Sequence, residues 1–185
     1  MRAVVLRRYG GPEELAVEEV PDPVTGPGQV LVEVAVAGVT FVETQVRADR
    51  GPRRAELPAV LGNGVAGTVV AVGEGADPAL AGARVVTTLG GQGGYAELAV
   101  ADAADVIPVP AGVPAEHAVA LLADGRTALG LTRAPRPRRE SGCWSRRPGA
   151  AWAACWCSSP APPGASWARP AAPPSVRWPP PWARS

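Results

Sequence analysis

A glycine- and proline-rich stretch at residues 57–75 constrains the fold more than any other part of the chain. It reads LPAVLGNGVAGTVVAVGEG. Thr68 to Val72 is predicted to be a buried strand, and Gly73-Glu74-Gly75 is a turn signal. Glycines at this density remove Cβ atoms where two backbones, or a backbone and a ligand, come close together. The stretch alone leaves two interpretations open: a bulged barrel corner, or a loop that approaches a ligand.

Short strands separated by glycine and proline turns surround this stretch. We expect strands at 1–8, 15–20, 29–36, 84–88 and 95–100, and extended chain at 105–110. The clearest strand is 29–36, in which one face is formed by Val30, Val32, Val34 and Val36. Six or seven short strands with little helix predict a mainly β fold, a small and partly open β-barrel.

Two segments have helical patterns. Thr40 to Ala48 has a helical period, and Thr40 and Glu43 have the spacing of a capping box. A second helix is expected from Pro114, with one apolar face at Ala118, Leu121 and Leu122. We expect Gly125 to break or cap that helix, and a new helical turn to run from Thr127 to Thr132.

The composition changes at about residue 132. Residues 1–132 contain 9 Arg and 16 acidic residues, a net charge of −7, whereas residues 133–185 contain 9 Arg and one Glu, a net charge of +8. All six Trp, all three Cys and 12 of the 22 Pro lie in the second segment. This contrast predicts a folded domain at 1–132 and an irregular or disordered Arg/Pro/Trp-rich tail at 133–185.

Signals for a membrane or for secretion are absent from the sequence. It has no apolar run of ~18 residues, and its N-terminus lacks the basic start, apolar centre and cleavage site of a secretory signal. The total net charge of +1 indicates no particular charged partner. We therefore expect a soluble cytoplasmic protein with no membrane partner.

Four motifs in order carry a resemblance to a known family. They are AGVTFVET, the stretch 57–75, GGYAELAV and VIPVPAGVPAEHAVALLADGRTAL. Together they resemble the N-terminal GroES-like half of the medium-chain dehydrogenase/reductase superfamily, in its zinc-free, quinone-oxidoreductase-like branch. The resemblance covers residues 1–132. It implies that this half forms the substrate wall, that a following Rossmann domain binds NADPH, and that hydride passes to a quinone or carbonyl between them. Many members of the family are homodimers.

The positions of the zinc ligands in related enzymes hold other residues here. Zinc-dependent members carry a Cys just after the strand that ends in Ala-Gly, and a His-Glu pair inside the glycine stretch. This chain has Thr40 and Asn63-Gly64 at those positions, no Cys before residue 143, and a single His, His117. Zinc needs several thiolate, imidazole or carboxylate ligands in one place. We therefore expect no metal, and we interpret His117 as a surface or packed histidine.

Without a metal, hydroxyl or amide groups must donate hydrogen bonds to the oxyanion of a carbonyl being reduced. The resemblance assigns Thr40, Phe41 and Glu43 to the catalytic side, where the branch commonly has Asn, an aromatic or aliphatic residue, and an acid. We assign Asn63 and Thr127 to cofactor binding, because Thr127 stands where the family has a Thr near the nicotinamide. Structural interpretations stay open: capping for Thr40 and Glu43, a turn for Asn63, and a helix start for Thr127.

The family's dinucleotide fingerprint does not follow residue 132. The chain lacks Lys and has one Asn, one Ile and one Phe, as expected of a very GC-rich gene. In a shifted frame, residues from Glu140 can read ERVLVEAAGGGVGGLLVQLARAAGAVVG, a strand, a glycine-rich turn and a helix. Trp has a single codon, and its final G fixes the first base of the next shifted codon. The shifted codons that begin in this way at Trp144, Trp152, Trp156 and Trp167 give Val, Gly, Val and Gly. We therefore expect the tail to be a frameshifted remnant of a Rossmann domain.

Other interpretations of the tail are weaker. Metal or redox chemistry is suggested by Cys143, Cys155 and Cys157, but no His accompanies them. Arg and Trp together suggest nucleic-acid binding, but no predicted element presents them on one surface. We therefore expect no nucleic-acid partner. The family reduces quinones or enones with NADPH, but we expect this chain to bind no NADPH and to be inactive. The alternative is a non-catalytic GroES-like interaction or small-ligand-binding module.

Overall fold

The structure is a computed structural model, and it describes residues 1–133. The predicted tail therefore lies outside the described residues, apart from Arg133. Over the described part, the elements follow one another as β1 (Arg2–Leu6), η1 (Pro12–Glu14), β2 (Leu15–Glu19), β3 (Gln29–Ala37), α1 (Phe41–Arg47), β4 (Ala59–Val60), β5 (Gly64–Val72), η2 (Pro78–Leu80), β6 (Arg84–Thr88), β7 (Leu98–Asp102), η3 (Ala103–Asp105), β8 (Ile107–Pro108) and α2 (Ala115–Arg133). The η elements are short 3₁₀ helices.

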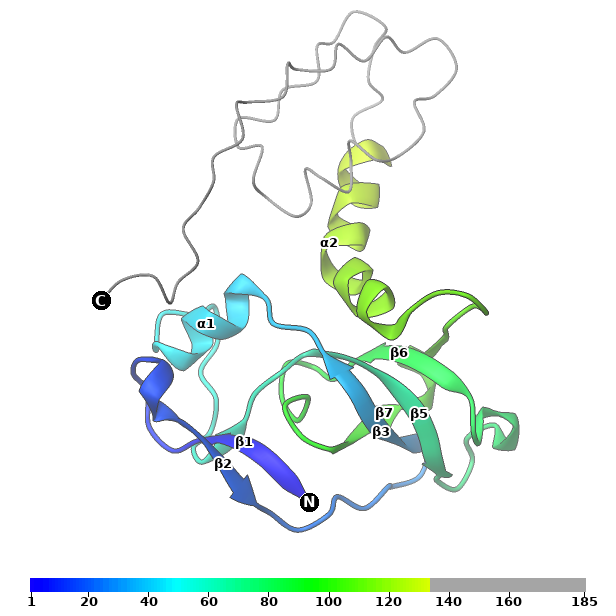
Figure 1. Cartoon of the computed structure of the whole chain (residues 1–185), viewed down its shortest axis with the longest axis horizontal. Helices are drawn as coiled ribbons and strands as arrows, with labels where there is room; N and C mark the ends of the chain where they lie inside the picture. Colours follow the sequence, from blue (N-terminus) through cyan, green and yellow to red (C-terminus); the bar gives the residue numbers. More distant parts are fainter. Residues whose placement is uncertain (134–185) are drawn as a thin grey trace, which may run out of the picture.

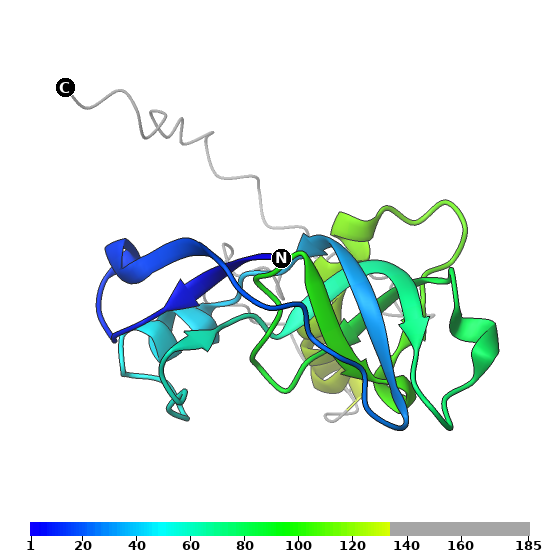
Figure 2. The same cartoon turned by 90° about the horizontal axis from the view of Figure 1, so that it is seen from below.

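Two antiparallel sheets form the body of the domain. The smaller has the strand order β2-β1-β4, and the larger has the order β7-β3-β5-β6-β8. Residues 95–97 join the sheets: Ala96 bridges to Ala3 of β1, and the Val34 N–H of β3 donates to the Glu97 carbonyl at 2.8 Å. Figure 2 shows the larger sheet curving on one side of the molecule and the smaller sheet on the other. The predicted mainly β, partly open barrel is confirmed.

The valine face of β3 supplies the centre of the core. Val30 and Val32 are fully buried, and they pack with Val69 of β5 and Val85 of β6. Val34 and Val36 are only partly buried, and the register with β5 shifts between them. The predicted alternation therefore holds for Val30 and Val32, whereas Val36 packs against the cluster beneath α2.

Two glycines of the central stretch bring backbones close together. Gly67 in β5 lies against β3, where a Cβ atom would collide with the Glu33 carbonyl oxygen. Gly62 has φ of 103°, and a Cβ there would lie 2.8 Å from the backbone nitrogen of Tyr95. At both positions the close neighbour is another strand or loop, as the barrel-corner interpretation predicts.

The starts of two predicted strands differ from the structure, and one strand was missed. β5 begins at Gly64 rather than Thr68, because the glycines pair with β3 and β6 instead of forming a loop. β7 begins at Leu98 rather than at residue 95, because the preceding residues pair with the smaller sheet. The two-residue strand β4 was not predicted; it pairs with β1.

The long helix α2 continues through Gly125, so the predicted break there and the new start at Thr127 are wrong. Gly125 is buried, and α2 packs on β3, β5 and β6, with Val119 and Leu122 in the cluster beneath it. A glycine inside a helix costs about 1 kcal/mol relative to alanine, which the burial of two large side chains outweighs. Figure 1 shows α2 standing at one end of the curved sheet, above β6.

Candidate functional site

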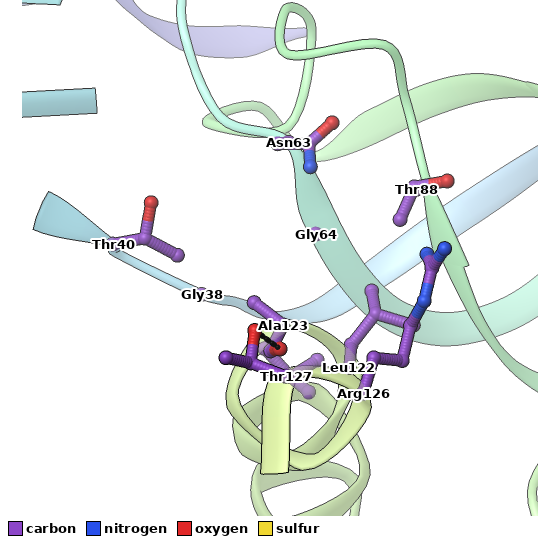
Figure 3. Close-up of a pocket in the computed structure, with 10 residues that line it drawn as sticks. Gly38, Thr40, Asn63, Gly64, Thr88, Leu122, Ala123, Arg126 and Thr127 are labelled. Carbon is purple, nitrogen blue, oxygen red and sulfur yellow. Dashed lines mark hydrogen bonds between the residues drawn. The ribbon is translucent and has the colours of Figure 1, made fainter. Parts of the chain in front are cut away.

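A cavity of about 460 Å³ lies between α2 and the end of the barrel. Its polar wall consists of Thr40, Asn63, Thr88, Arg126 and Thr127. These side chains come from the exit of β3, the turn before β5, the end of β6 and one face of α2, as Figure 3 shows. The cavity therefore brings together three of the predicted site residues, Thr40, Asn63 and Thr127.

The remaining lining is small or apolar, and none of the cavity residues carries a carboxylate. Gly38 and Gly64 form part of the wall with backbone alone, and Val119, Leu122 and Ala123 contribute the apolar surface of α2. Hydroxyl, amide and guanidinium groups on an apolar wall are suited to a ligand with an apolar body and a carbonyl or anionic oxygen.

Glu43 lies behind the cavity rather than in its lining. Its side chain is 4% exposed, and its carboxylate accepts a hydrogen bond from the Thr40 backbone N–H at 2.5 Å and another from the Asn63 backbone N–H at 2.7 Å. The first bond belongs to the capping box predicted from the sequence, which is present at the start of α1. Glu43 thus fixes the backbone of two cavity residues from elements far apart in the sequence.

The phenol of Tyr95 lies close enough to Glu43 to interact with its charge. Its hydroxyl oxygen is buried and has no hydrogen-bond partner within residues 1–133. Burial raises the pKa of the Tyr95 phenol, and the negative charge of Glu43 adds to that effect. The phenol therefore stays protonated through the neutral range and beyond.

Phe41 points to solvent. Its side chain is 76% exposed, and the neighbouring Val39 and Val42 are exposed as well. These residues form an apolar edge around Thr40 at the turn between β3 and α1. The catalytic-side assignments of Phe41 and Glu43 stay predictions, and within the described residues neither lines the cavity.

Thr127 lies inside α2, which begins at Ala115, and not at the start of a helix as predicted. Its hydroxyl donates to the Ala123 carbonyl at 3.0 Å, drawn as a dashed line in Figure 3. The hydroxyl proton is therefore used within the helix, and the oxygen still has lone pairs with which to accept a hydrogen bond.

Sequence reasoning missed Arg126 and Thr88. A continuous helical period through Gly125 places Arg126 on the same side as Leu122, four residues earlier, so an unbroken helix would have indicated it. Thr88 ends β6 and pairs directly with Gly64, the first residue of β5. That pairing is a tertiary feature, and the sequence carries no local signal for it.

No metal-binding group of three or more His, Cys, Asp or Glu side chains exists within residues 1–133. His117 is exposed on α2, which agrees with its interpretation as a surface histidine. The same part of the chain has no helix that combines the length and apolar character needed to cross a bilayer. The cytoplasmic location stays a prediction.

The barrel, the helix across its end and the cavity between them define a GroES-like domain. Residues 26–111 match the family of the alcohol dehydrogenase GroES-like domain. This domain is similar to the N-terminal part of quinone oxidoreductases and of other medium-chain dehydrogenase/reductase structures, and the resemblance stated from the sequence is confirmed.

Curated relatives and solved structures agree with that assignment. The quinone oxidoreductase of Homo sapiens is 40% identical over 111 residues, which is 60% of this chain and 34% of the relative. The Escherichia coli quinone oxidoreductase complexed with NADPH has a TM-score of 0.67 at 30% identity, covering 72% of this chain and 40% of that one. A mycobacterial protein complexed with NADPH has a TM-score of 0.67 at 37% identity, covering 75% and 42%. The chain thus spans about a third of the length of the curated relatives it matches.

Proposed function

We propose that this chain is the substrate-side half of a zinc-free, NADPH-dependent oxidoreductase that transfers hydride to a quinone, enone or related carbonyl. The observation that carries the proposal is the cavity, which gathers Thr40, Asn63 and Thr127 from separate elements. The quinone oxidoreductases among its relatives, and the two similar structures that contain NADPH, support the same reaction class.

The cavity residues have distinct roles in this proposal. The Thr40 hydroxyl donates a hydrogen bond to the substrate oxygen as negative charge develops on it, and the Asn63 side-chain amide is assigned to the cofactor side of the cavity. The Thr127 oxygen would help to hold a nicotinamide ring by accepting a hydrogen bond from its carboxamide, because the Thr127 proton is donated to Ala123. Val119 and Leu122 exclude water from one side of the ligand.

Residues 1–133 do not fit the pyrophosphate of a dinucleotide cofactor. Pyrophosphate is usually held where a strand of a parallel sheet passes through a glycine-rich turn into a helix. Every strand pairing within residues 1–133 is antiparallel. The sequence after residue 132 carries no such fingerprint in the given frame. We infer from this that the 185-residue chain by itself binds no NADPH and has no turnover. The reading of the shifted frame supports the further inference that its tail is a frameshift product.

The nucleotide sequence and an activity assay test this proposal. An insertion or deletion near codons 134 to 140 is expected, and a chain with the frame restored from Glu140 is expected to oxidise NADPH in the presence of 1,4-benzoquinone. The 185-residue chain serves as the matched control and is expected to show only the background rate. An intact frame with no such change, or equal rates for the two proteins, would contradict the proposal.

A second candidate function rests on the completeness of the cavity. All of its lining residues lie within residues 1–133, so a small molecule can enter it without a second domain. A non-catalytic GroES-like module that binds a small ligand is therefore the alternative. Ligand binding by the 185-residue chain, with no NADPH oxidation by the frame-restored protein, would favour this alternative.

A further inference from the structure

We propose that Arg126 makes the cavity selective for a substrate that carries a carboxylate at the end opposite its reducible carbonyl. This inference rests on the proposed function, because it names a substrate class for the same site. Arg126 is the one charged side chain in the cavity lining, and the other polar groups there are neutral. Figure 3 shows its guanidinium extending from α2 past Leu122 toward Thr88.

The guanidinium of Arg126 is available to a ligand. Within residues 1–133, ion pairs engage Arg2, Arg7, Arg8 and Arg54. Backbone carbonyls accept hydrogen bonds from Arg47, Arg53 and Arg84. Arg126 has neither kind of partner in this part of the chain, although it borders the cavity. Most arginines of the domain are thus used to hold the fold, whereas the one at the site is not.

The chemistry of the guanidinium favours a carboxylate. Its planar fork of N–H donors matches the two oxygens of a carboxylate, and such charge-assisted bonds are stronger than neutral ones. The Thr88 hydroxyl, on the same side of the cavity in Figure 3, is a further donor for the same group. Thr40 lies on the opposite side, so a ligand's carbonyl and carboxylate can be held at separate ends.

The charge of the domain makes this recognition local. Residues 1–132 carry a net charge of −7, so the domain has no general attraction for anions. At the cavity, whose other polar groups are neutral, a preference for an anionic ligand therefore depends on the positive charge of Arg126. Removal of that charge is expected to abolish the preference rather than weaken it slightly.

The test compares benzoate with benzamide, which has the same ring and a neutral amide. Each is titrated into the ¹⁵N-labelled 185-residue chain, and the backbone amide signals of Asn63 and Thr88 report binding. Benzoate is expected to bind about five- to tenfold more tightly than benzamide, as a charge-assisted hydrogen bond implies. In Arg126→Gln the two ligands are expected to bind equally. Arg133→Gln, which removes the same charge from the end of the same helix, is expected to keep the preference.

The outcomes distinguish a failure of the role of Arg126 from a failure of the proposed function. Equal binding of benzoate and benzamide to the unmodified chain would overturn the role of Arg126 and leave the carbonyl site standing. An unchanged preference in Arg126→Gln would overturn it as well. If neither ligand moves the cavity signals, the proposed function fails together with the inference. Arg126 is exposed, so its replacement is expected to leave the dispersion of the amide spectrum unchanged. Arg126→Lys, which keeps the charge but loses the fork, is expected to retain part of the preference.

Discussion

The backbone N–H of Asn63 donates a 2.7 Å hydrogen bond to the carboxylate of Glu43, which lies 20 positions earlier in the chain. The other oxygen of the same carboxylate accepts from the Thr40 N–H. One buried acid therefore sets the separation of two cavity residues. Its geometry is that of a positioning group, since its oxygens are occupied by backbone donors and not directed at a ligand.

Glu43→Ala is expected to destabilise the domain by about 2–4 kcal/mol, because it leaves two backbone N–H groups without their acceptor. Glu43→Gln keeps one acceptor oxygen but turns an amide N–H₂ toward the other donor, so a smaller loss is expected. Urea unfolding followed by circular dichroism measures both. Glu13→Ala, in the exposed turn η1, is the control and should stay within about 0.5 kcal/mol of the parent. A Glu43→Ala domain as stable as this control would contradict the positioning role.

Two glycines are expected to respond to alanine in opposite directions. Gly67→Ala drives a methyl group into the Glu33 carbonyl and should cost about 1–3 kcal/mol or more. Gly130→Ala places a methyl group in open space on α2, where alanine favours the helix by about 0.5–1 kcal/mol, so stability should rise. Thermal unfolding of both variants measures the two changes in stability. A loss for Gly67→Ala with a gain for Gly130→Ala shows that the effect comes from the close contact between the strands and not from replacing glycine in general. A stable Gly67→Ala variant would show that β3 and β5 do not approach as described.

Tyr95→Phe tests the buried phenol at high pH. The folded state raises the pKa of Tyr95 above that of the unfolded chain, near 10. The stabilisation from this raised pKa is therefore fully present below about pH 10 and is lost as the pH rises through the folded pKa. Tyr95→Phe should flatten the decline of stability above about pH 10, and at neutral pH it should be neutral or stabilising, because it removes an unpartnered hydroxyl.

Tyr9→Phe is the matched comparison for that experiment. The Tyr9 hydroxyl donates to the Ala55 carbonyl at 2.5 Å, so its removal should lower stability at neutral pH by about 1 kcal/mol. An alkaline decline as steep in Tyr95→Phe as in the parent would contradict the burial argument. Guanidinium unfolding at several pH values from 7 to 11 provides the measurement.

Thr40 and Thr127 are expected to differ when their hydroxyls are removed. In the frame-restored chain, Thr40→Val should lower kcat/KM for 1,4-benzoquinone by about 10²-fold or more, because a donor to the developing oxyanion is lost. Thr127→Val should act mainly through the KM for NADPH, since that oxygen is proposed to accept from the nicotinamide carboxamide. Steady-state kinetics with each substrate varied in turn separates the two effects. Equal effects of both variants on both substrates would contradict the assigned roles.

Local patterns in the sequence predicted much of the fold and three of the five polar residues that line the cavity. The alternation of Val30 and Val32 and the spacing of Thr40 and Glu43 are set within a few residues, and both features are present. The predicted helix break at Gly125 was wrong because α2 is stabilised by packing on the barrel. Local helix propensity does not include that packing. That error also concealed Arg126. The bond from Glu43 to Asn63 joins separate elements and becomes visible only once they are folded.

NADPH binding by the 185-residue chain tests the central claim most directly, namely that this chain holds the substrate wall without a dinucleotide site. Isothermal titration of NADPH into this chain is expected to give no heat of binding beyond dilution, whereas the frame-restored protein is expected to bind. Tight binding of NADPH by the 185-residue chain would contradict the account.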